Sequence, residues 1–397
     1  MSGEKRALVF GASGVTGWAL VNEILNDYPK KGVWGGVVAL TNRPLSLEQS
    51  QWPKDKRLSI VSGIDLLQGS QEDLENTLEA KVPDINKITH VLYLAYKAQT
   101  DIQAELREAV AMFQRAVMAV DRLSPDLEFV VLQTGAKHYG CHLLHDRPAI
   151  MKPPLSESLP CLPSPYGEDL FYNPQIDWLN EYSAAKKWGW ADTRPDIIIG
   201  FVPNQNFYSL GTVLGIYLSL RREVDGEGAE CPFPGTEASW GALSIDSSSD
   251  MIARQTLHVS LTAPWKDRKG EAFNVADARG PSCWREKWPV LCAYFGLRGV
   301  KLERDNPVEV RGYIREHIDV WNRMEEKYGL QSGHADSPRT FPGFEYFLLT
   351  QFDTDRQYDM TKMYDRAGFT EERSTREAWG GVFDRMRKAK VIPSEFR

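Results

Sequence analysis

Gly11-Ala12-Ser13-Gly14-Val15-Thr16-Gly17 is the stretch of sequence that decides the fold of this chain. The strand-like run Ala7–Phe10 precedes it, and the helix-like pattern Val15–Asn26 follows it. In such a turn Gly11 permits the sharp bend, Gly14 lets the backbone approach a pyrophosphate, and Gly17 lets helix and strand pack closely. The amino end of the helix adds unpaired N–H groups and a positive dipole. The segment therefore predicts a dinucleotide-binding turn, with a purely structural glycine turn as the less favoured alternative.

Short apolar runs alternate with longer helical patterns over the first two hundred residues. The predicted strands are Ala7–Phe10, Gly36–Leu40, Leu58–Val61, His90–Leu94, Phe129–Leu132 and Asp196–Val202. The predicted helices between them are Val15–Asn26, Gln71–Leu78, Asp101–Arg122 and Ile176–Trp188. Short strands separated by helices need right-handed crossovers and therefore a parallel sheet. We predict an α/β fold with a doubly wound, Rossmann-type sheet, which binds ligands at the carboxyl ends of its strands.

The alternation ends near residue 203 and a mostly helical region follows. It contains predicted helices at Thr212–Arg222, Asp246–Leu261, Cys283–Phe295, Val308–Tyr328 and Thr375–Lys390, a loop at Glu223–Gly235 and one further strand at Glu271–Val275. We expect a dinucleotide-binding domain over residues 1–203, completed by about 240–277, and a substrate cap over 204–239 and 278–397. Late aromatic residues fit either an apolar substrate pocket or the core: Trp240, Trp265, Trp284, Phe341, Phe344 and Phe347.

Composition and charge exclude several classes of protein. The 47 basic and 54 acidic residues give a net charge of −7, which argues against a general nucleic-acid binder. No apolar run approaches the roughly 18–20 residues that cross a bilayer, and no signal-peptide core is present. The five scattered cysteines form no CxxC pair, which is typical of reduced core cysteines. We therefore expect a cytoplasmic protein with no membrane or nucleic-acid partner.

The end of the second predicted strand bears on the choice of cofactor. A site that prefers NAD usually has an acidic residue here to hold the ribose 2′-hydroxyl, and this chain has none. Thr41, Asn42 and Arg43 could instead hold a 2′-phosphate, with Arg43 supplying the charge, although a solvated loop arginine is the alternative. The predicted cofactor is NADPH. Asp65 and Leu66 lie where a side chain would meet the adenine, but an ordinary aspartate turn is nearly as well supported.

A lysine and a tyrosine are the candidate catalytic pair. Lys137 comes just after the fifth predicted strand, at the ligand-facing edge. Tyr182 and Lys186 spell YxxxK, the signature of short-chain dehydrogenases, but Tyr182 falls in the middle of its predicted helix. Tyr172 stands at the start of that helix, where its hydroxyl can reach the edge, so we favour Tyr172 and regard Tyr166 as a weaker substitute.

Three histidines in the following segment raise the question of a metal. His138, His142 and His145 have the spacing i, i+4, i+7, but Gly140 and Pro148 favour a loop over a helix that would present all three. No acidic residue completes an evident site. We therefore expect no metal here.

The segments that carry a family resemblance extend over nearly the whole chain. Beside the glycine turn they are Gln133-Thr134-Gly135-Ala136-Lys137-His138-Tyr139, Phe171-Tyr172, Arg194-Pro195-Asp196-Ile197-Ile198-Ile199-Gly200-Phe201-Val202-Pro203, Ala272-Phe273-Asn274-Val275, Trp284-Arg285-Glu286-Lys287-Trp288 and Lys388-Ala389-Lys390-Val391-Ile392-Pro393. Together they resemble the progesterone 5-beta-reductase/iridoid synthase family, which are atypical extended short-chain dehydrogenases. Members of that family reduce carbon–carbon double bonds conjugated to a carbonyl group.

The resemblance implies roles for individual residues. Lys137 and Tyr172 match the catalytic lysine and tyrosine of the family. The matching cofactor positions are Ser13, Gly14, Val15 and Thr16 in the pyrophosphate loop, then Gln133 and Ile198, with Ala95 in place of a hydroxyl residue. Where family members commonly carry a paired arginine after the second strand, this chain has Leu40 and Thr41, which leaves Arg43 as the nearby cation.

The function that the resemblance implies is that of an NADPH-dependent oxidoreductase, an ene-reductase of a small apolar or specialised metabolite. Hydride would go to the β-carbon, while Tyr172 and Lys137 stabilise the enolate oxygen. A carbonyl reductase, dehydrogenase or cyclase on the same fold is one alternative, and a non-catalytic NADP-sensing regulator is another. The expected partner is a small-molecule substrate, and a homodimer is compatible with this interpretation.

Overall fold

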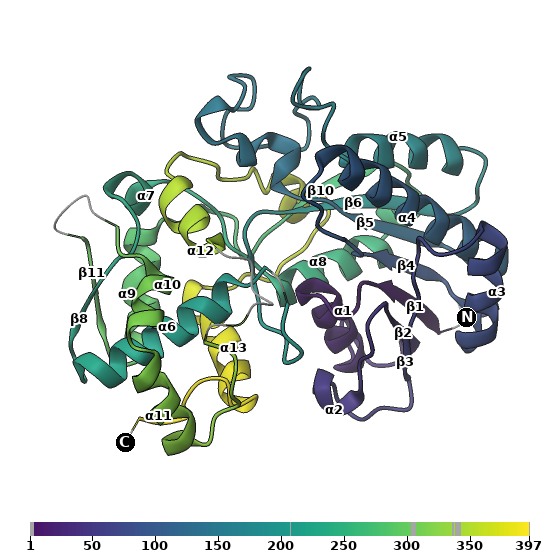
Figure 1. Cartoon of the computed structure of the whole chain (residues 1–397). Coiled ribbons are helices and arrows are strands. Elements are labelled where there is room, and N and C mark those ends of the chain that lie inside the picture. Colours follow the sequence, from purple (N-terminus) through teal and green to yellow (C-terminus); the bar gives the residue numbers. More distant parts are fainter. Residues whose placement is uncertain (1–3, 207, 303–306, 336, 338–342, 397) are drawn as a thin grey trace.

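The centre of the molecule is a parallel β-sheet, shown in Figure 1. The computed structural model describes residues 4–206, 208–302, 307–335, 337 and 343–396. The sheet has seven strands in the order β3–β2–β1–β4–β5–β6–β10. Their bounds are β1 Lys5–Phe10, β2 Trp34–Thr41, β3 Leu58–Ser62, β4 His90–Tyr93, β5 Phe129–Gln133, β6 Gly189–Pro195 and β10 Glu271–Val275. This order is the predicted doubly wound topology, and the strand order reverses between β1 and β4, where such folds bind ligands.

Helices cover both faces of the sheet. One face is covered by α3 (Gln71–Lys81), α4 (Ile102–Leu123) and α5 (Tyr172–Ser183), and the other by α1 (Val15–Leu25) and α8 (Ser249–Leu261). Alternate residues of one strand face opposite layers: Leu8 and Phe10 of β1 pack toward α3–α5, and Ala7 and Val9 pack toward α1 and α8. Strands buried on both faces read as apolar runs, which explains why most of them are visible in the sequence.

The sixth strand was placed wrongly from the sequence. The apolar run Asp196–Val202 was predicted as a strand, but the strand is β6, Gly189–Pro195, and the run contributes only the short β7, Ile198–Ile199. β6 contains Asp192 and Arg194, and both side chains are buried because they pair with each other. A search for apolar runs misses β6 because this strand contains the charged residues Asp192 and Arg194. The helix predicted over Ile176–Trp188 starts earlier, at Tyr172, and ends earlier, at Ser183.

The remaining elements form a lobe beside the sheet, which we call the cap (Figure 1). They are α6 Leu210–Asp225, β8 Glu230–Pro232, α7 Glu237–Gly241, α9 Trp284–Tyr294, β11 Arg298–Val300, α10 Val310–Glu316, α11 Ile318–Tyr328, α12 Phe344–Tyr346 and α13 Thr375–Lys388. Shorter pieces are α2 Leu47–Ser50, β9 Ser247–Ser248, 3₁₀ turns η1 Ile85–Lys87, η2 Ala136–Tyr139, η3 Cys141–Asp146 and η4 Trp265–Asp267, and π-helical turns η5 Phe347–Gln351 and η6 Lys362–Arg366.

Three sequence predictions after residue 203 differ from the structure. The helix predicted over Val308–Tyr328 is two helices that meet at His317, and the one predicted from Asp246 starts at Ser249, after β9. The predicted loop Glu223–Gly235 contains the end of α6 and β8, which pairs with β11.

The late tryptophans belong to the core. Trp240, Trp265 and Trp284 are buried, and the Phe233 ring lies 5.2 Å from that of Trp240 and 5.5 Å from that of Trp284. Phe344 and Phe347 are partly buried, and Phe341 lies outside the described residues. One continuous apolar cluster joins α1 and α8 to the cap helices. Within the described residues, no helix is both long and apolar enough to cross a membrane.

Candidate active site

The glycine turn joins β1 to α1 in the geometry that a pyrophosphate requires. Gly11 has φ +82°, and a Cβ built on it would come within 2.8 Å of the Ala95 backbone nitrogen. A Cβ on Gly17 would come within 2.3 Å of the Gly11 carbonyl oxygen. Within the described residues, no side chain caps the amino end of α1 and no acidic residue lies in its first turn. Close backbone packing and unpaired N–H groups fit a dinucleotide phosphate.

Other predicted cofactor residues gather around this turn. The Gln133 side-chain nitrogen donates to Thr16 Oγ1 at 3.4 Å, and Asn204 Nδ2 donates to the Ser13 carbonyl at 3.0 Å. Gln133 Oε1 is buried and has no hydrogen-bond partner among the described residues, so a bound hydroxyl or amide could donate to it. A Cβ on Gly200 would meet the Val15 side chain at 2.2 Å, which places the segment after Ile198 against the turn.

The residues predicted to contact the adenosine part of the cofactor differ in burial and in hydrogen bonding. Thr41 is buried, and its hydroxyl donates to the Arg43 carbonyl at 2.7 Å. Asn42 and Arg43 are exposed, and neither makes an ion pair within the described chain. Leu66 packs in the core against α3 instead of lining an edge, and Asp65 Oδ1 accepts from the Leu67 backbone at 2.9 Å. Asp65 therefore forms an aspartate turn, and its contact with the adenine stays a prediction.

Lys137 and Tyr172 both lie in segments at the carboxyl edge of the sheet. Lys137 lies in η2, the turn after β5, and its side chain is exposed. Tyr172 is the first residue of α5, as the sequence predicts. A Cβ built on Gly135, at the start of the turn, would lie 3.5 Å from the Tyr172 hydroxyl, so this hydroxyl lies close to the start of the turn. This edge also carries the glycine turn.

The Tyr172 phenol stays protonated in this environment. Burial raises the pKa of the phenol, and the nearby carboxylate of Glu105 raises this pKa further. The sequence predicts that the Lys137 ammonium could lower the pKa of Tyr172. This prediction is wrong, because the pKa is raised, by burial first and then by the Glu105 carboxylate. A neutral phenol is a hydrogen-bond donor at physiological pH.

Two residues that sequence reasoning missed lie next to Tyr172. The Tyr96 ring stacks on Phe171, with centroids 5.7 Å apart, and Phe171 lies 4.8 Å from Tyr172. The Tyr96 hydroxyl donates to Glu105, which lies in the first turn of α4. Tyr96 comes three residues after β4, at the ligand-facing edge, and this position in the sequence could have marked it as a candidate site residue. Glu105 gave no signal because its approach to Tyr172 depends on the tertiary fold.

Tyr182 of α5 and Lys186, which follows this helix, form a structural cluster with α4. Asp121 of α4 accepts from the Tyr182 hydroxyl at 2.8 Å, from the Lys186 ammonium at 2.6 Å and from the Trp188 indole at 2.7 Å. This carboxylate ties α4 to the segment after α5 and occupies both groups of the motif. Tyr182 also lies toward the other end of α5 from Tyr172.

The three histidine side chains lie in different environments. His138 and His142 are largely buried, and burial lowers the pKa of each to about 4. The Lys137 ammonium adds to the lowering for His142, which places these two side chains near each other. His145 is exposed and lies 3.1 Å from a carboxylate oxygen of Asp353. Within the described residues, no three His, Cys, Asp or Glu side chains are grouped as metal ligands.

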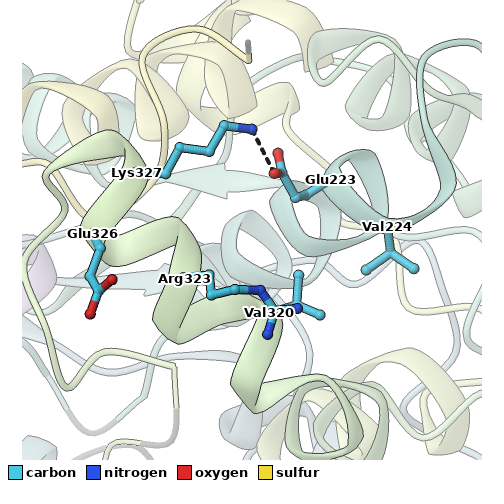
Figure 2. Close-up of a pocket in the computed structure, with 6 residues that line it drawn as sticks. All are labelled: Glu223, Val224, Val320, Arg323, Glu326 and Lys327. Carbon is cyan, nitrogen blue, oxygen red and sulfur yellow. Dashed lines mark hydrogen bonds and ion pairs between the residues drawn. The ribbon is translucent and has the colours of Figure 1, made fainter.

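A groove of about 770 Å³ on the cap is separate from this edge. It lies between α6 and α11 and is lined by Glu223, Val224, Val320, Arg323, Glu326 and Lys327. Figure 2 shows Lys327 reaching across to Glu223, with which it makes an ion pair of 2.8 Å. The groove shares no residue with the glycine turn, η2 or α5, so we assign it no part in the chemistry.

Comparison with known proteins shows the family of this chain. Residues 7–393 match the family described as the PRISE-like Rossmann-fold domain. The chain belongs to this family. A short chain dehydrogenase of Aspergillus calidoustus is 36% identical to this PRISE-like chain over 394 residues, covering 98% of it and 94% of the relative.

More distant relatives and solved structures extend the comparison. The 3-oxo-Delta(4,5)-steroid 5-beta-reductase of Arabidopsis thaliana is 25% identical over 392 residues, covering 98% of this chain and 94% of the relative. The (S)-8-oxocitronellyl enol synthase of Nepeta cataria is 25% identical over 391 residues with the same coverage. A UDP-glucuronic acid 4-epimerase from Bacillus cereus, solved with NAD, shares the fold, with a TM-score of 0.56, 14% identity and coverage of 96% and 99%. This PRISE-like chain is therefore an oxidoreductase of the short-chain dehydrogenase type.

Proposed function

We propose that this chain uses NADPH to reduce a carbon–carbon double bond conjugated to a carbonyl group in a small apolar metabolite. The observation that carries the proposal is the Tyr172 hydroxyl, held against the Lys137 turn at the edge that also bears the glycine turn. Two relatives at 25% identity, a 3-oxo-steroid 5-beta-reductase and an enol synthase, support this reaction class by their names.

The chain's own residues account for the electrostatic part of the reaction. NADPH, when bound, would supply a hydride from its nicotinamide ring. As the hydride reaches the β-carbon, an electron pair moves to the carbonyl oxygen, where the Tyr172 phenol donates a hydrogen bond. A donor already aimed at this oxygen is commonly the largest single catalytic contribution. A proton from water then completes the C–H bond at the α-carbon, so the product is the saturated carbonyl compound.

The preference for NADPH rests on the end of β2. No acidic residue follows the strand to hold a ribose 2′-hydroxyl. Thr41 is engaged in the fold, whereas the exposed Arg43 guanidinium could pair with a 2′-phosphate through charge-assisted hydrogen bonds.

An apolar substrate is supported by a row of aromatic rings that leads from Tyr172 to the cap. Beyond Tyr172, Phe171 and Tyr96, the row continues through Tyr208 to Phe344, with centroid separations of 6.4 Å and 5.3 Å. Tyr96 and Tyr208 are 41% and 36% exposed, so these rings offer accessible apolar area beside the catalytic hydroxyl.

A screen for NADPH consumption tests the proposal. It compares small cyclic enones and enals with the matching saturated ketones and aldehydes, and identifies the products by mass spectrometry. We expect consumption with the unsaturated compounds and formation of the saturated carbonyl product. Allylic alcohols as products would support carbonyl reduction instead, and cyclised products a cyclase. NADPH binding without turnover of any compound would support a regulator.

A further inference from the structure

A buried polar cluster lies beneath the turn that carries Lys137. Its members, which we call the Tyr139 hub, are Thr134, Tyr139, Asp192, Arg194 and Asn274. All five are at most 6% exposed. They come from the end of β5, from η2, from β6 and from β10, so the hub joins neighbouring strands at the carboxyl edge of the sheet.

The Tyr139 hydroxyl is the link between the charged and neutral parts of the hub. It accepts from Arg194 Nη1 at 3.3 Å and donates to Asn274 Oδ1 at 2.7 Å. Arg194 in turn donates to Asp192 Oδ2 at 2.6 Å, so its charge is paired within the hub. The hydroxyl therefore uses both its donor and its acceptor capacity, and it joins Arg194 to Asn274.

Asn274 connects the hub to the segments that surround the site. Its Nδ2 donates to the carbonyl of Leu155 at 2.8 Å and to that of Asp359 at 3.1 Å. Leu155 lies in the long connection between β5 and α5, which ends at Tyr172, and Asp359 lies near the cap. Through Tyr139 and Asn274, both segments that lead to the site share one anchoring point.

The hub lies next to the catalytic elements in the chain. Tyr139 and Lys137 belong to the same four-residue turn, η2. The residue before this turn is Gly135, and a Cβ built on Gly135 would lie 3.5 Å from the Tyr172 hydroxyl. A short 3₁₀ turn has few hydrogen bonds of its own, so its position depends on tertiary anchors. Buried polar networks that are fully satisfied hold their members in one arrangement.

We propose that Tyr139 is a positioning residue for the Lys137–Tyr172 pair, because its hydroxyl fixes η2 to β6 and β10. This inference rests on the proposed function, since it takes Lys137 and Tyr172 as the groups that act on the substrate. Tyr139 itself contacts neither substrate nor cofactor in this account. It acts by setting where the turn stands, and displacement of reacting groups by about 1 Å can cost on the order of a hundredfold in rate.

The test uses Tyr139→Phe and a matched control in the whole protein. Tyr358 is also buried, and its ring packs edge-on against Tyr139 with centroids 5.6 Å apart, but its hydroxyl has no hydrogen-bond partner in the described chain. Tyr358→Phe therefore removes a neighbouring hydroxyl without touching the hub. For each variant, sites are counted by NADPH titration, and kcat is expressed per binding site on an enone found in the screen.

We expect Tyr139→Phe to lower kcat per site by about tenfold or more, with KM and the Kd for NADPH changed less than about twofold. Tyr358→Phe should keep kcat within about twofold of the wild type. If a folded Tyr139→Phe protein has fewer NADPH-binding sites or a lower melting temperature but an unchanged kcat per remaining site, the role of Tyr139 is merely structural and the proposal is overturned. Equal kcat values for the two variants would also overturn it.

A second variant covers the case in which Tyr139→Phe does not fold. Arg194→Lys keeps a positive charge beside Asp192, but one ammonium cannot reach both Asp192 and Tyr139 as the guanidinium does, so the same loss confined to kcat is expected. Tyr172→Phe is measured in parallel. If Tyr172→Phe keeps full turnover, the proposed catalytic assignment is wrong. If it is inactive while both hub variants match the control, only the positioning role fails.

Discussion

The two tyrosines that the sequence offers as catalytic residues differ in the position and bonding of their hydroxyl groups. Tyr172 begins α5 at the ligand-facing edge, whereas Tyr182 lies ten residues along the helix, roughly 15 Å away at about 1.5 Å per residue, and is bound to Asp121. We expect Tyr172→Phe to lower turnover about a hundredfold or more while NADPH binding stays nearly unchanged, because one preorganised donor to the oxyanion is lost. Tyr182→Phe should behave as a mild packing change. Steady-state kinetics of the two variants decide between them, and the reverse pattern would make Tyr182 and Lys186 the working pair.

The charge of the Arg43 side chain bears on the choice between NADPH and NADH. Its guanidinium is exposed at the end of β2, where a 2′-phosphate would lie. Arg43→Ala should weaken NADPH binding about tenfold and leave NADH binding nearly unchanged, since only NADPH carries the phosphate. Quenching of tryptophan fluorescence by each cofactor gives both dissociation constants. Equal or tighter binding of NADH to the wild-type protein would contradict the expected preference.

Among single residues, the sequence predicts the positions of those whose placement depends on their neighbours in the chain. The glycine spacing identifies the cofactor turn, and the helix start places Tyr172, because both depend on neighbours in the chain. Glu105 and the Tyr139 hub could not be found in this way. Their contacts join residues far apart in sequence, such as Tyr139 and Asn274, and depend on strands that pair only in the folded sheet.

Among the elements, β10 and α9 were predicted almost to the residue, whereas β6 was missed. β10 has an ordinary apolar pattern, but β6, which lies between β5 and β10, carries the buried residues Asp192 and Arg194. Such a strand is stable only because its charges pair with each other after folding. A search for apolar periodicity therefore selects the nearby run that ends at Val202, and the error follows from a buried ion pair that no local pattern reveals.

The amino end of α8 makes a prediction about pH. Asp277 Oδ1 accepts from the Ser248 backbone nitrogen at 2.8 Å and from its hydroxyl at 2.6 Å. Burial nevertheless raises the pKa of Asp277 to about 7, above the value of about 3.9 in an unfolded chain. Between these two values the folded state binds more protons, so this group makes stability fall as pH rises from about 4 to 7.

Asp277→Asn removes that dependence and keeps an oxygen that can accept from Ser248. We expect the variant to gain stability relative to the wild type between pH 5 and pH 8, by about 2 kcal/mol, because one pKa unit corresponds to about 1.4 kcal/mol. Urea unfolding at the two pH values measures this difference. A stability difference that is the same at pH 5 and pH 8 would mean that Asp277 does not titrate in this window.

At the scale of the whole molecule, a charge cluster links the sheet and the cap. Asp250 of α8 accepts from Arg373 and from Arg385 of α13, both at 2.9 Å, and its side chain is 8% exposed. The apolar core is continuous across the same boundary. A continuous core predicts that sheet and cap unfold together, so that tryptophan fluorescence and far-ultraviolet circular dichroism report one transition.

Asp250→Asn tests how strongly the cap depends on this cluster. The variant leaves two guanidinium groups beside each other without their carboxylate, and breaking a buried pair costs about 3–5 kcal/mol. Glu230→Gln is the matched control, because its pair with Arg298 is 55% and 67% exposed and should contribute less than about 1 kcal/mol. Guanidinium unfolding should show a large shift of the midpoint for Asp250→Asn and almost none for Glu230→Gln. If the fluorescence and dichroism transitions of Asp250→Asn separate, the cap unfolds first and the ion cluster, more than the shared apolar core, couples it to the sheet. If they stay coincident at the lower midpoint, the core alone is sufficient to make the two parts one cooperative unit.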